Sequence, residues 1–147
     1  MNALFETDGG WAAFVLRITL GSVFFAHGAQ LALGWFGGHG FKNTVQQLKQ
    51  LGIPPPIGAL VILAQFLGSL GLIVGLLTRI AAFGILVVML GAIFLVHTKV
   101  GFFMNWYGQQ QGEGYEYHLL AAAVAIALII VGAGNLSLDA VIAAASH

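Results

Sequence analysis

The sequence predicts an all-α membrane protein in which four transmembrane helices form an antiparallel bundle and a short interfacial amphipathic helix lies between the first and the second. Two observations carry this prediction. Hydrophobic residues make up 59% of the 147 residues and charged residues only 7%, whereas a soluble domain has about 25% charged residues. The chain also contains four apolar runs, each close to the ~20 residues that cross the hydrocarbon core of a bilayer. Lipid is therefore the expected surrounding of most of the chain.

The predicted spans cover residues 11–33, 57–77, 80–98 and 117–134, within one transmembrane domain of residues 1–147. Only Thr78 and Arg79 separate the second span from the third, so these two helices should be antiparallel neighbours. Four spans put both termini on one side of the membrane. Basic residues divide two against three between the sides, which does not decide the orientation, although a tight turn that carries Arg79 favours cytoplasmic termini.

The connection between the first and second spans predicts the interfacial helix. Apolar residues recur there with helical spacing, at Phe41, Val45, Leu48 and Leu51. Lysine and glutamine fill most of the positions between them, which is typical of a helix that lies in the membrane interface. Gly52 and Pro54 end the pattern. We expect a helix over residues 43–51 that covers one end of the bundle.

Polar residues inside the first two spans have two interpretations each. Arg17 lies about two turns inside the first span, on one face with Gly21 and Gly28. It either extends to the nearer head groups or faces inward as a contact for an anion or a quinone oxygen. In the second span Gln65 and Ser69 share a face, and a polar pair that hydrogen-bonds across a helix interface is the simplest interpretation.

The stretch between the third and fourth spans holds most of the chemically useful groups. His97 and Glu116 lie at adjoining ends of these spans, so both side chains can face one pocket, and His27 reaches the same side of the membrane. Trp106 and Tyr115 are candidates for the wall of that pocket. We therefore predict a binding site formed by His97, Glu116, His27, Arg17, Trp106 and Tyr115.

Simpler roles exist for the same residues. The aromatic residues fit an interfacial belt, and His97 with Glu116 fits a hydrogen-bonded pair that fastens two helices. His118 lies two residues after Glu116, about 200° around a helix, so the two cannot share a face. The histidines lack the spacing of a helical ligand pair, so no metal site is expected.

Composition excludes several classes of function. The net charge is zero, which argues against nucleic acid as a partner. The chain has no cysteine, which excludes disulfides, thiol redox chemistry and cysteine-ligated clusters. Redox chemistry would need a non-covalently bound quinone, a haem, or a metal held by His, Asp or Glu, and we expect no covalently bound cofactor.

Short motifs along nearly the whole chain resemble those of the DoxX family of small four-helix membrane proteins. The matching pieces are RITLG (17–21), HG (27–28), LGIP (51–54), GLLTR (75–79), GFF (101–103), GYEYH (114–118) and GAGNLSLD (132–139). The family is named for a subunit of a thiosulfate:quinone oxidoreductase. The resemblance implies a multi-pass protein of the bacterial inner membrane with a link to quinone chemistry. One departure is Gln65, where family members often have a glutamate, so a proton-coupled role at this position is not expected.

Two functional hypotheses follow. In the first, the chain is a component of a quinone-linked membrane oxidoreductase system, whose redox partner is another membrane or periplasmic subunit. In the second, it is a non-catalytic accessory subunit that packs against a larger membrane complex through glycine and alanine faces. The sequence alone does not decide between an enzyme subunit and an accessory protein.

Overall fold

The computed structural model describes residues 2–8 and 10–146, and within these residues the chain is all-α, without strands. The α-helices are α1 (Gly10–Leu33), α2 (Gly40–Gln50), α3 (Pro55–Val74), α4 (Thr78–Leu95), α5 (Glu116–Val131) and α6 (Leu138–Ala145). Short 3-10 turns cover Asn2–Leu4, Trp35–Gly37 and His97–Lys99. The predicted all-α class is therefore confirmed, and each predicted helix has a counterpart.

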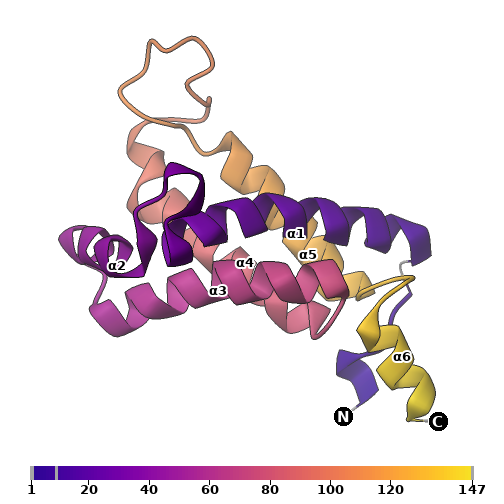
Figure 1. Cartoon of the computed structure of the whole chain (residues 1–147). Helices are drawn as coiled ribbons and strands as arrows, with labels where there is room; N and C mark the ends of the chain where they lie inside the picture. The colour runs from indigo at the N-terminus through magenta and orange to yellow at the C-terminus, as the bar shows by residue number, and fades with distance from the viewer. Residues whose placement is uncertain (1, 9, 147) are drawn as a thin grey trace.

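The helices pack as neighbours in an antiparallel arrangement. α1 packs against α3, α3 against α4, and α4 against α5, while α2 packs on α1 and α3. Figure 1 shows α2 and the long loop between α4 and α5 at one end of the molecule, and α6 with both termini at the other. We call these the α2 end and the α6 end.

Three helices are long and apolar enough to cross a membrane, over Gly10–Leu33, Pro55–Val74 and Thr78–Lys99. α5 is apolar but has only 16 residues, about 24 Å of helix at 1.5 Å per residue, against a hydrocarbon core of about 30 Å. The predicted fourth span continued to residue 134. The helix instead ends at Val131, because Gly132 leaves the helical region with a φ of 82°. Three candidate spans are thus shown, and the fourth is not.

Glycines allow the closest helix contact, between α1 and α3. A Cβ atom on Gly28 would lie 2.7 Å from Cα of Phe66, and one on Gly21 would lie 3.1 Å from the main-chain nitrogen of Ile73. No other residue fits such a backbone approach without displacement of α3. The face of α1 that carries Arg17, Gly21 and Gly28 is therefore the face that receives α3.

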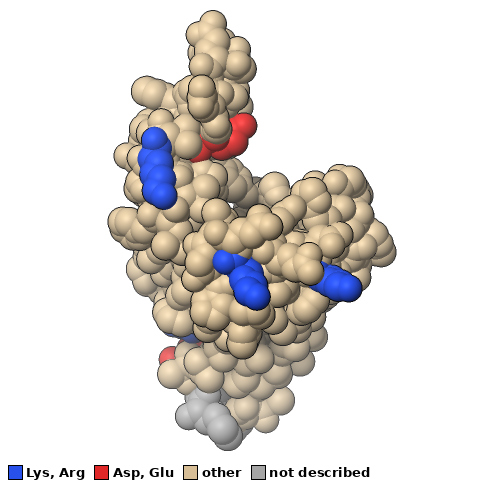
Figure 2. Space-filling model, turned by 90° about the vertical axis from the view of Figure 1, so that its left-hand side faces the viewer, with Lys and Arg blue, Asp and Glu red and all other residues tan. Residues whose placement is uncertain are grey.

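The outer surface is largely hydrocarbon. The core contains Phe24, Leu72, Ile85 and Leu128, all at most 1% exposed. Large apolar side chains also point outward from every long helix, including Trp11, Leu60, Phe94, Leu120 and Ile130. Figure 2, which looks onto the α2 end, shows only scattered charged side chains on a mostly uncharged surface. A surface of this kind matches a lipid environment.

Candidate functional site

A cavity of about 360 Å³ lies between α2 and the helices that it covers. It is lined by residues from the end of α1, α2, the first half of α3, the second half of α4 and the first turn of α5. This volume lies within the usual range of ligand pockets, about 300–1,000 Å³. Most of its lining is aliphatic, none of it is Lys, Arg, Asp or Glu, and its main polar groups are Thr44, Gln65 and His118.

The covering helix α2 is attached through Thr44. This residue is 3% exposed, and its hydroxyl donates a hydrogen bond of 3.2 Å to the carbonyl oxygen of Leu31 in α1. Leu48, one turn later, lies against Gly58 of α3 and also lines the cavity. The apolar face predicted for the amphipathic helix therefore forms one wall of the cavity.

Gln65 presents an unpaired amide to this cavity. Its side chain is only 8% exposed, and the described part of the chain shows no hydrogen-bond partner for it. The expected polar pair with Ser69 does not form, because the Ser69 hydroxyl donates to the carbonyl oxygen of Phe66 in its own helix, at 2.7 Å. Buried polar groups are nearly always paired, so an unpaired amide beside a cavity is a group available to a ligand.

His118 is the second such group. Its side chain is 9% exposed, and Nδ1 is buried without a hydrogen-bond partner among the described residues. It lies in the first turn of α5 and is the one ionisable side chain in the lining described here. An imidazole nitrogen donates or accepts according to its tautomer, so His118 can meet either a carbonyl oxygen or a hydroxyl group of a ligand.

His97 lies against His118 and is not itself part of the cavity lining. The two ring centroids are 4.0 Å apart and the planes are inclined by 31°. Nδ1 of His97 lies 2.7 Å from the carbonyl oxygen of Glu113. Since a carbonyl only accepts, Nδ1 carries the proton. His97 thus supports the ring of His118 and ties it to the loop.

Glu116 does not pair with His97 in the structure. Its Oε1 accepts hydrogen bonds from the main-chain N–H of Met104, at 3.1 Å, and from the indole N–H of Trp106. The main-chain N–H of Asn105 donates to Glu113 Oε2 at 2.7 Å. The two carboxylates therefore close the loop between α4 and α5, and Glu116 lies on the loop side of α5 rather than the bundle side.

The remaining predicted residues at the α2 end lie around this loop or on the outside of α1. Trp106 is 71% exposed, and Tyr115 packs edge-on against Phe102 at 5.5 Å between ring centroids. His27 is exposed, with its ring 6.1 Å from that of Tyr117. None of these three residues lines the cavity.

Arg17 is far from this cluster and fully buried at the α6 end. All five guanidinium N–H groups donate to main-chain carbonyl oxygens, which leaves no donor for a ligand. The acceptors are Leu72, Ile73, Ala133, Asn135 and Leu136, at 2.7–3.2 Å. Both earlier interpretations of Arg17, extension to the head groups and contact with a ligand, are therefore wrong for this structure: the side chain fastens the end of α3 to the segment after α5.

Asp139 completes the α6 end. Its carboxylate, 1% exposed, accepts hydrogen bonds from the main-chain N–H groups of Leu77 and Thr78 at 2.7 and 2.9 Å, and so caps the start of α4. It also attracts the charge of Arg17. Gly75 fits between these groups, since a Cβ atom there would lie 2.4 Å from Cβ of Ser137. Gly75 therefore serves contacts within the chain.

The chemistry available at the cavity is that of neutral hydrogen bonding. Within residues 2–8 and 10–146 no three His, Cys, Asp or Glu side chains gather as candidate metal ligands. Unpaired amide and imidazole groups in an apolar cavity fit a neutral ring with oxygen substituents, whereas an anion would find no fixed positive charge there.

Comparison with known proteins identifies the family. The sequence profile of the DoxX family matches residues 12–98, more than half of the chain. The chain belongs to the DoxX family. It is also 29% identical over 139 residues to a Bacillus subtilis (strain 168) protein named "Putative oxidoreductase CatD", which covers 95% of this chain and 90% of that protein. No solved structure matches the chain.

Sequence reasoning missed the cavity residues for identifiable reasons. The pattern of the second span predicts a packing role for Gln65, Thr44 carries no signal of its own, and the prediction of a site at Glu116 excludes His118, which does not share a face with it. The 200° separation was correct, but His118 is the member that faces the bundle. The signal was the register of α5: a helix that begins at Glu116 points its third residue away from its first.

Proposed function

We propose that this DoxX protein is a component of a quinone-linked oxidoreductase system of the bacterial inner membrane, and that it binds the quinone ring in the cavity beneath α2. The observation that carries the proposal is the buried, unpaired Nδ1 of His118, whose side chain lines one apolar cavity together with Gln65, for which the described residues show no hydrogen bond. The relative from Bacillus subtilis with "oxidoreductase" in its name supports the redox class.

The proposed membrane arrangement has four spans. α5 serves as the fourth, because it is apolar and packs along α4, and the short segment after it extends its reach. α2 lies in the interface and closes the ring site from above. A bound quinone supplies the capacity to exchange two electrons and two protons, and the electron donor or acceptor is a subunit other than this chain.

The residues of this chain bind and orient the ring. The Gln65 amide offers both a donor and an acceptor, and His118 offers one or the other. The ring of His97, tilted against that of His118, supports it from the neighbouring segment. Aliphatic walls from α3 and α4 exclude water, which strengthens each hydrogen bond at the site.

The test is quinone binding to the purified protein in lipid nanodiscs. A neutral hydrogen bond contributes about 0.5–1.5 kcal/mol, so Gln65→Leu and His118→Phe should each weaken binding by about threefold to tenfold. Ser69→Ala is the matched control, since this hydroxyl bonds within its own helix one turn away. Glu116→Gln is measured in the same assay, to compare the cavity with the site that the sequence predicts at His97, Glu116 and Trp106.

Unchanged affinity in both cavity variants would refute the proposal. A larger loss with Glu116→Gln than with Gln65→Leu would return the site to His97, Glu116 and Trp106, as the sequence first predicted.

One observation favours the accessory role as a second candidate. The loop between α4 and α5 is held by many internal hydrogen bonds, yet it presents Phe103, Trp106 and Tyr107 at 65%, 71% and 89% exposure. A rigid aromatic surface outside the bundle suits contact with another subunit. Gentle detergent purification of the wild type and of Trp106→Ala and Tyr107→Ala tests this role. If the role is correct, a subunit co-purifies with the wild type and is lost from both variants.

A further inference from the structure

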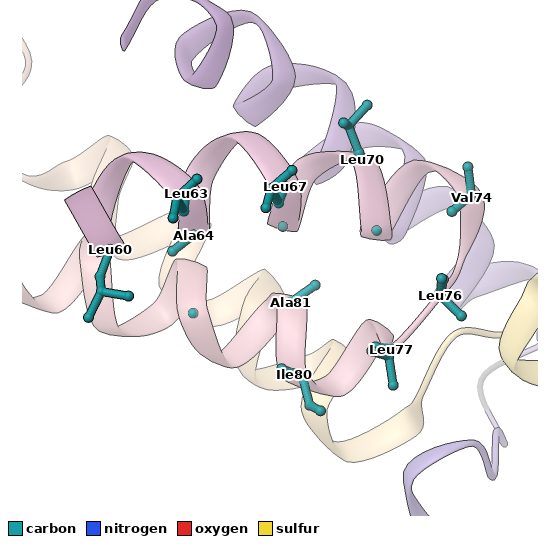
Figure 3. A pocket seen from close by; sticks show the side chains of 13 residues that line it. Leu60, Leu63, Ala64, Leu67, Leu70, Val74, Leu76, Leu77, Ile80 and Ala81 are labelled. Atoms are coloured by element: carbon teal, nitrogen blue, oxygen red, sulfur yellow. The ribbon is translucent and has the colours of Figure 1, made fainter. Parts of the chain in front are cut away.

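The outer surface of α3 and α4 marks the depth at which the acyl chains of the membrane lie. A groove of about 650 Å³ runs along these two helices, and every residue that lines it is apolar. Figure 3 shows Ala64 and Ala81 between the two helices, with larger side chains such as Leu67 and Leu77 at the borders. Such a surface suits the hydrocarbon of a bilayer. α2 precedes α3 and lies at the end of the bundle (Figure 1), and thus at the level of the head groups.

Exposed aromatic and aliphatic side chains surround α2. Trp35 and Phe36 are exposed in the turn before α2. Phe41 is exposed at the start of α2, and Leu51 is exposed directly after its end. Aromatic rings are enriched where hydrocarbon meets head groups, and an amphipathic helix that lies at this boundary inserts such side chains. These residues therefore set the depth of α2 in the membrane.

The lysines of α2 lie on one exposed face. Lys42 and Lys49 are seven residues apart, and Gln46 lies between them on the same face; all three side chains are exposed. Seven residues of helix place the two lysines about 10 Å apart along the axis. The opposite face, with Thr44 and Leu48, lies on the bundle. α2 therefore turns its apolar face to the cavity and its positive charge outward.

The chain offers these lysines little negative charge of its own. The sequence has no Asp or Glu between residues 9 and 112. Glu113 and Glu116, the two carboxylates at the α2 end, accept hydrogen bonds from N–H groups of their own loop. Figure 2 shows most of the acidic surface of this face in one patch, with the basic side chains apart from it. The counter-charge for α2 must therefore come from outside the chain.

α2 is attached to the bundle by few polar contacts. Among the described residues, one hydrogen bond joins a side chain of α2 to a spanning helix, from Thr44 to the carbonyl oxygen of Leu31. Gly40 and Gly52, at the two ends of α2, have φ angles of 74° and 85°, which glycine adopts readily. Since α2 is a short element between glycine turns, an outside contact adds appreciably to its hold on the cavity.

We propose that anionic phospholipid head groups bind Lys42 and Lys49 and hold α2 over the cavity. Each lysine beside an anionic membrane surface strengthens binding by about fivefold. The partner is a phospholipid rather than a soluble anion, because the exposed rings of Trp35, Phe36 and Phe41 place the lysines beside acyl chains. The proposal does not depend on which molecule the cavity binds.

The test is hydrogen–deuterium exchange of residues 40–51 in nanodiscs, followed by mass spectrometry. The wild type is placed in phosphatidylcholine alone and in an equal mixture of phosphatidylcholine and phosphatidylglycerol. The double variant Lys42→Gln with Lys49→Gln removes the proposed contacts. Lys99→Gln is the matched control, since Lys99 is an exposed lysine at the same end but outside α2. Inorganic phosphate added to the phosphatidylcholine discs serves as the soluble anion.

We expect phosphatidylglycerol to slow the exchange of residues 40–51 in the wild type by about tenfold, since two lysines at about fivefold each set an upper limit of about 25-fold. Lys99→Gln should behave as the wild type, and the double variant should exchange equally fast in both lipids. High salt should reduce the effect, because it screens exposed charges. Residues 60–74 of α3 should exchange equally in both lipids.

Three results would overturn the proposal. Equal exchange of wild-type α2 in both lipids would show that head-group charge does not hold this helix. Slowing by phosphatidylglycerol that persists in the double variant would place the lipid contact elsewhere. Slowing by inorganic phosphate in phosphatidylcholine discs would make the lysines a site for a soluble anion. None of these results bears on the ring site, because quinone binding in phosphatidylcholine alone tests the proposed function separately.

Discussion

Replacement of Arg17 by methionine should strongly destabilise the protein. The change removes five hydrogen bonds that a fully buried guanidinium donates to main-chain carbonyl oxygens, and it leaves the buried carboxylate of Asp139 without its opposite charge. A hydrogen bond to a charged group contributes about 1.5–3 kcal/mol, but such bonds do not add, and losses above ~5 kcal/mol are exceptional.

Removal of one partner from a buried charge network costs about 3–5 kcal/mol. For a chain of this size, ~3 °C per kcal/mol converts this cost into a melting temperature roughly 10–15 °C lower. Thermal unfolding in detergent, followed by circular dichroism, measures the change. Arg17→Lys is the intermediate variant, because an ammonium group keeps the charge but has three donors instead of five.

A measurement of quinone binding distinguishes the structural role of Arg17 from the ligand contact that the sequence also allows. Figure 1 shows the α6 end at the opposite end of the bundle from α2, which covers the proposed ring site, so folded Arg17→Lys should bind quinone as the wild type does. A melting temperature within about 2 °C of wild type for Arg17→Met would refute the reasoning, as would loss of quinone affinity in Arg17→Lys at a temperature where it is fully folded.

Four further predictions follow from single contacts. Asp139→Asn should lower stability by about 1–2 kcal/mol in thermal unfolding, because the cap of α4 loses its charge and one acceptor; an unchanged transition contradicts this. Gly28→Ala should cost about 1–3 kcal/mol because its Cβ meets the backbone of Phe66, whereas Gly91→Ala, with nothing within 4 Å, should be harmless. Gln65→Leu should leave the melting temperature within about 2 °C of the wild type in the absence of quinone, since the described residues show no hydrogen bond that the change would remove. Single cysteines at His39 and Gln109, both exposed in a chain without native cysteine, should react with an impermeant maleimide from the same side of the membrane.

The helices were predictable because their signals are local. Apolar runs of membrane length set α1, α3 and α4, and the period of Phe41, Val45 and Leu48 set α2. The ends moved by a few residues where left-handed backbone intervened, as at Gly75 after α3 and Gly132 after α5. The all-α class needs only these local patterns, whereas the membrane depth of α5 depends on packing that its 16 residues do not specify.

The site was less predictable because its contacts are distant in sequence and partly main-chain. The acceptors of Arg17 are carbonyl oxygens up to 119 residues away, and carbonyl groups leave no mark in a sequence. The adjoining helix ends predict that Glu116 and His97 meet, but the loop offers Glu116 nearer donors, the N–H groups of Met104 and Trp106. A carboxylate binds the nearest preorganised donors, and a loop's hydrogen-bonding pattern cannot be derived from its length.

The two ends of the bundle differ in where their unpaired buried polar atoms lie. At the α6 end every guanidinium donor of Arg17 has an acceptor and Asp139 caps a helix, and the unpaired Thr78 Oγ1 and Arg79 Nε line neither the cavity nor the groove along α3 and α4. At the α2 end the unpaired Nδ1 of His118 belongs to a side chain that lines a cavity together with Gln65. An unpaired buried group costs about 1–3 kcal/mol, and an aliphatic residue of similar size would avoid that cost. Groups that lower the stability of the free protein in this way are typical of binding sites, where a ligand supplies the missing partners. The contrast therefore assigns stability to the α6 end and ligand binding to the α2 end.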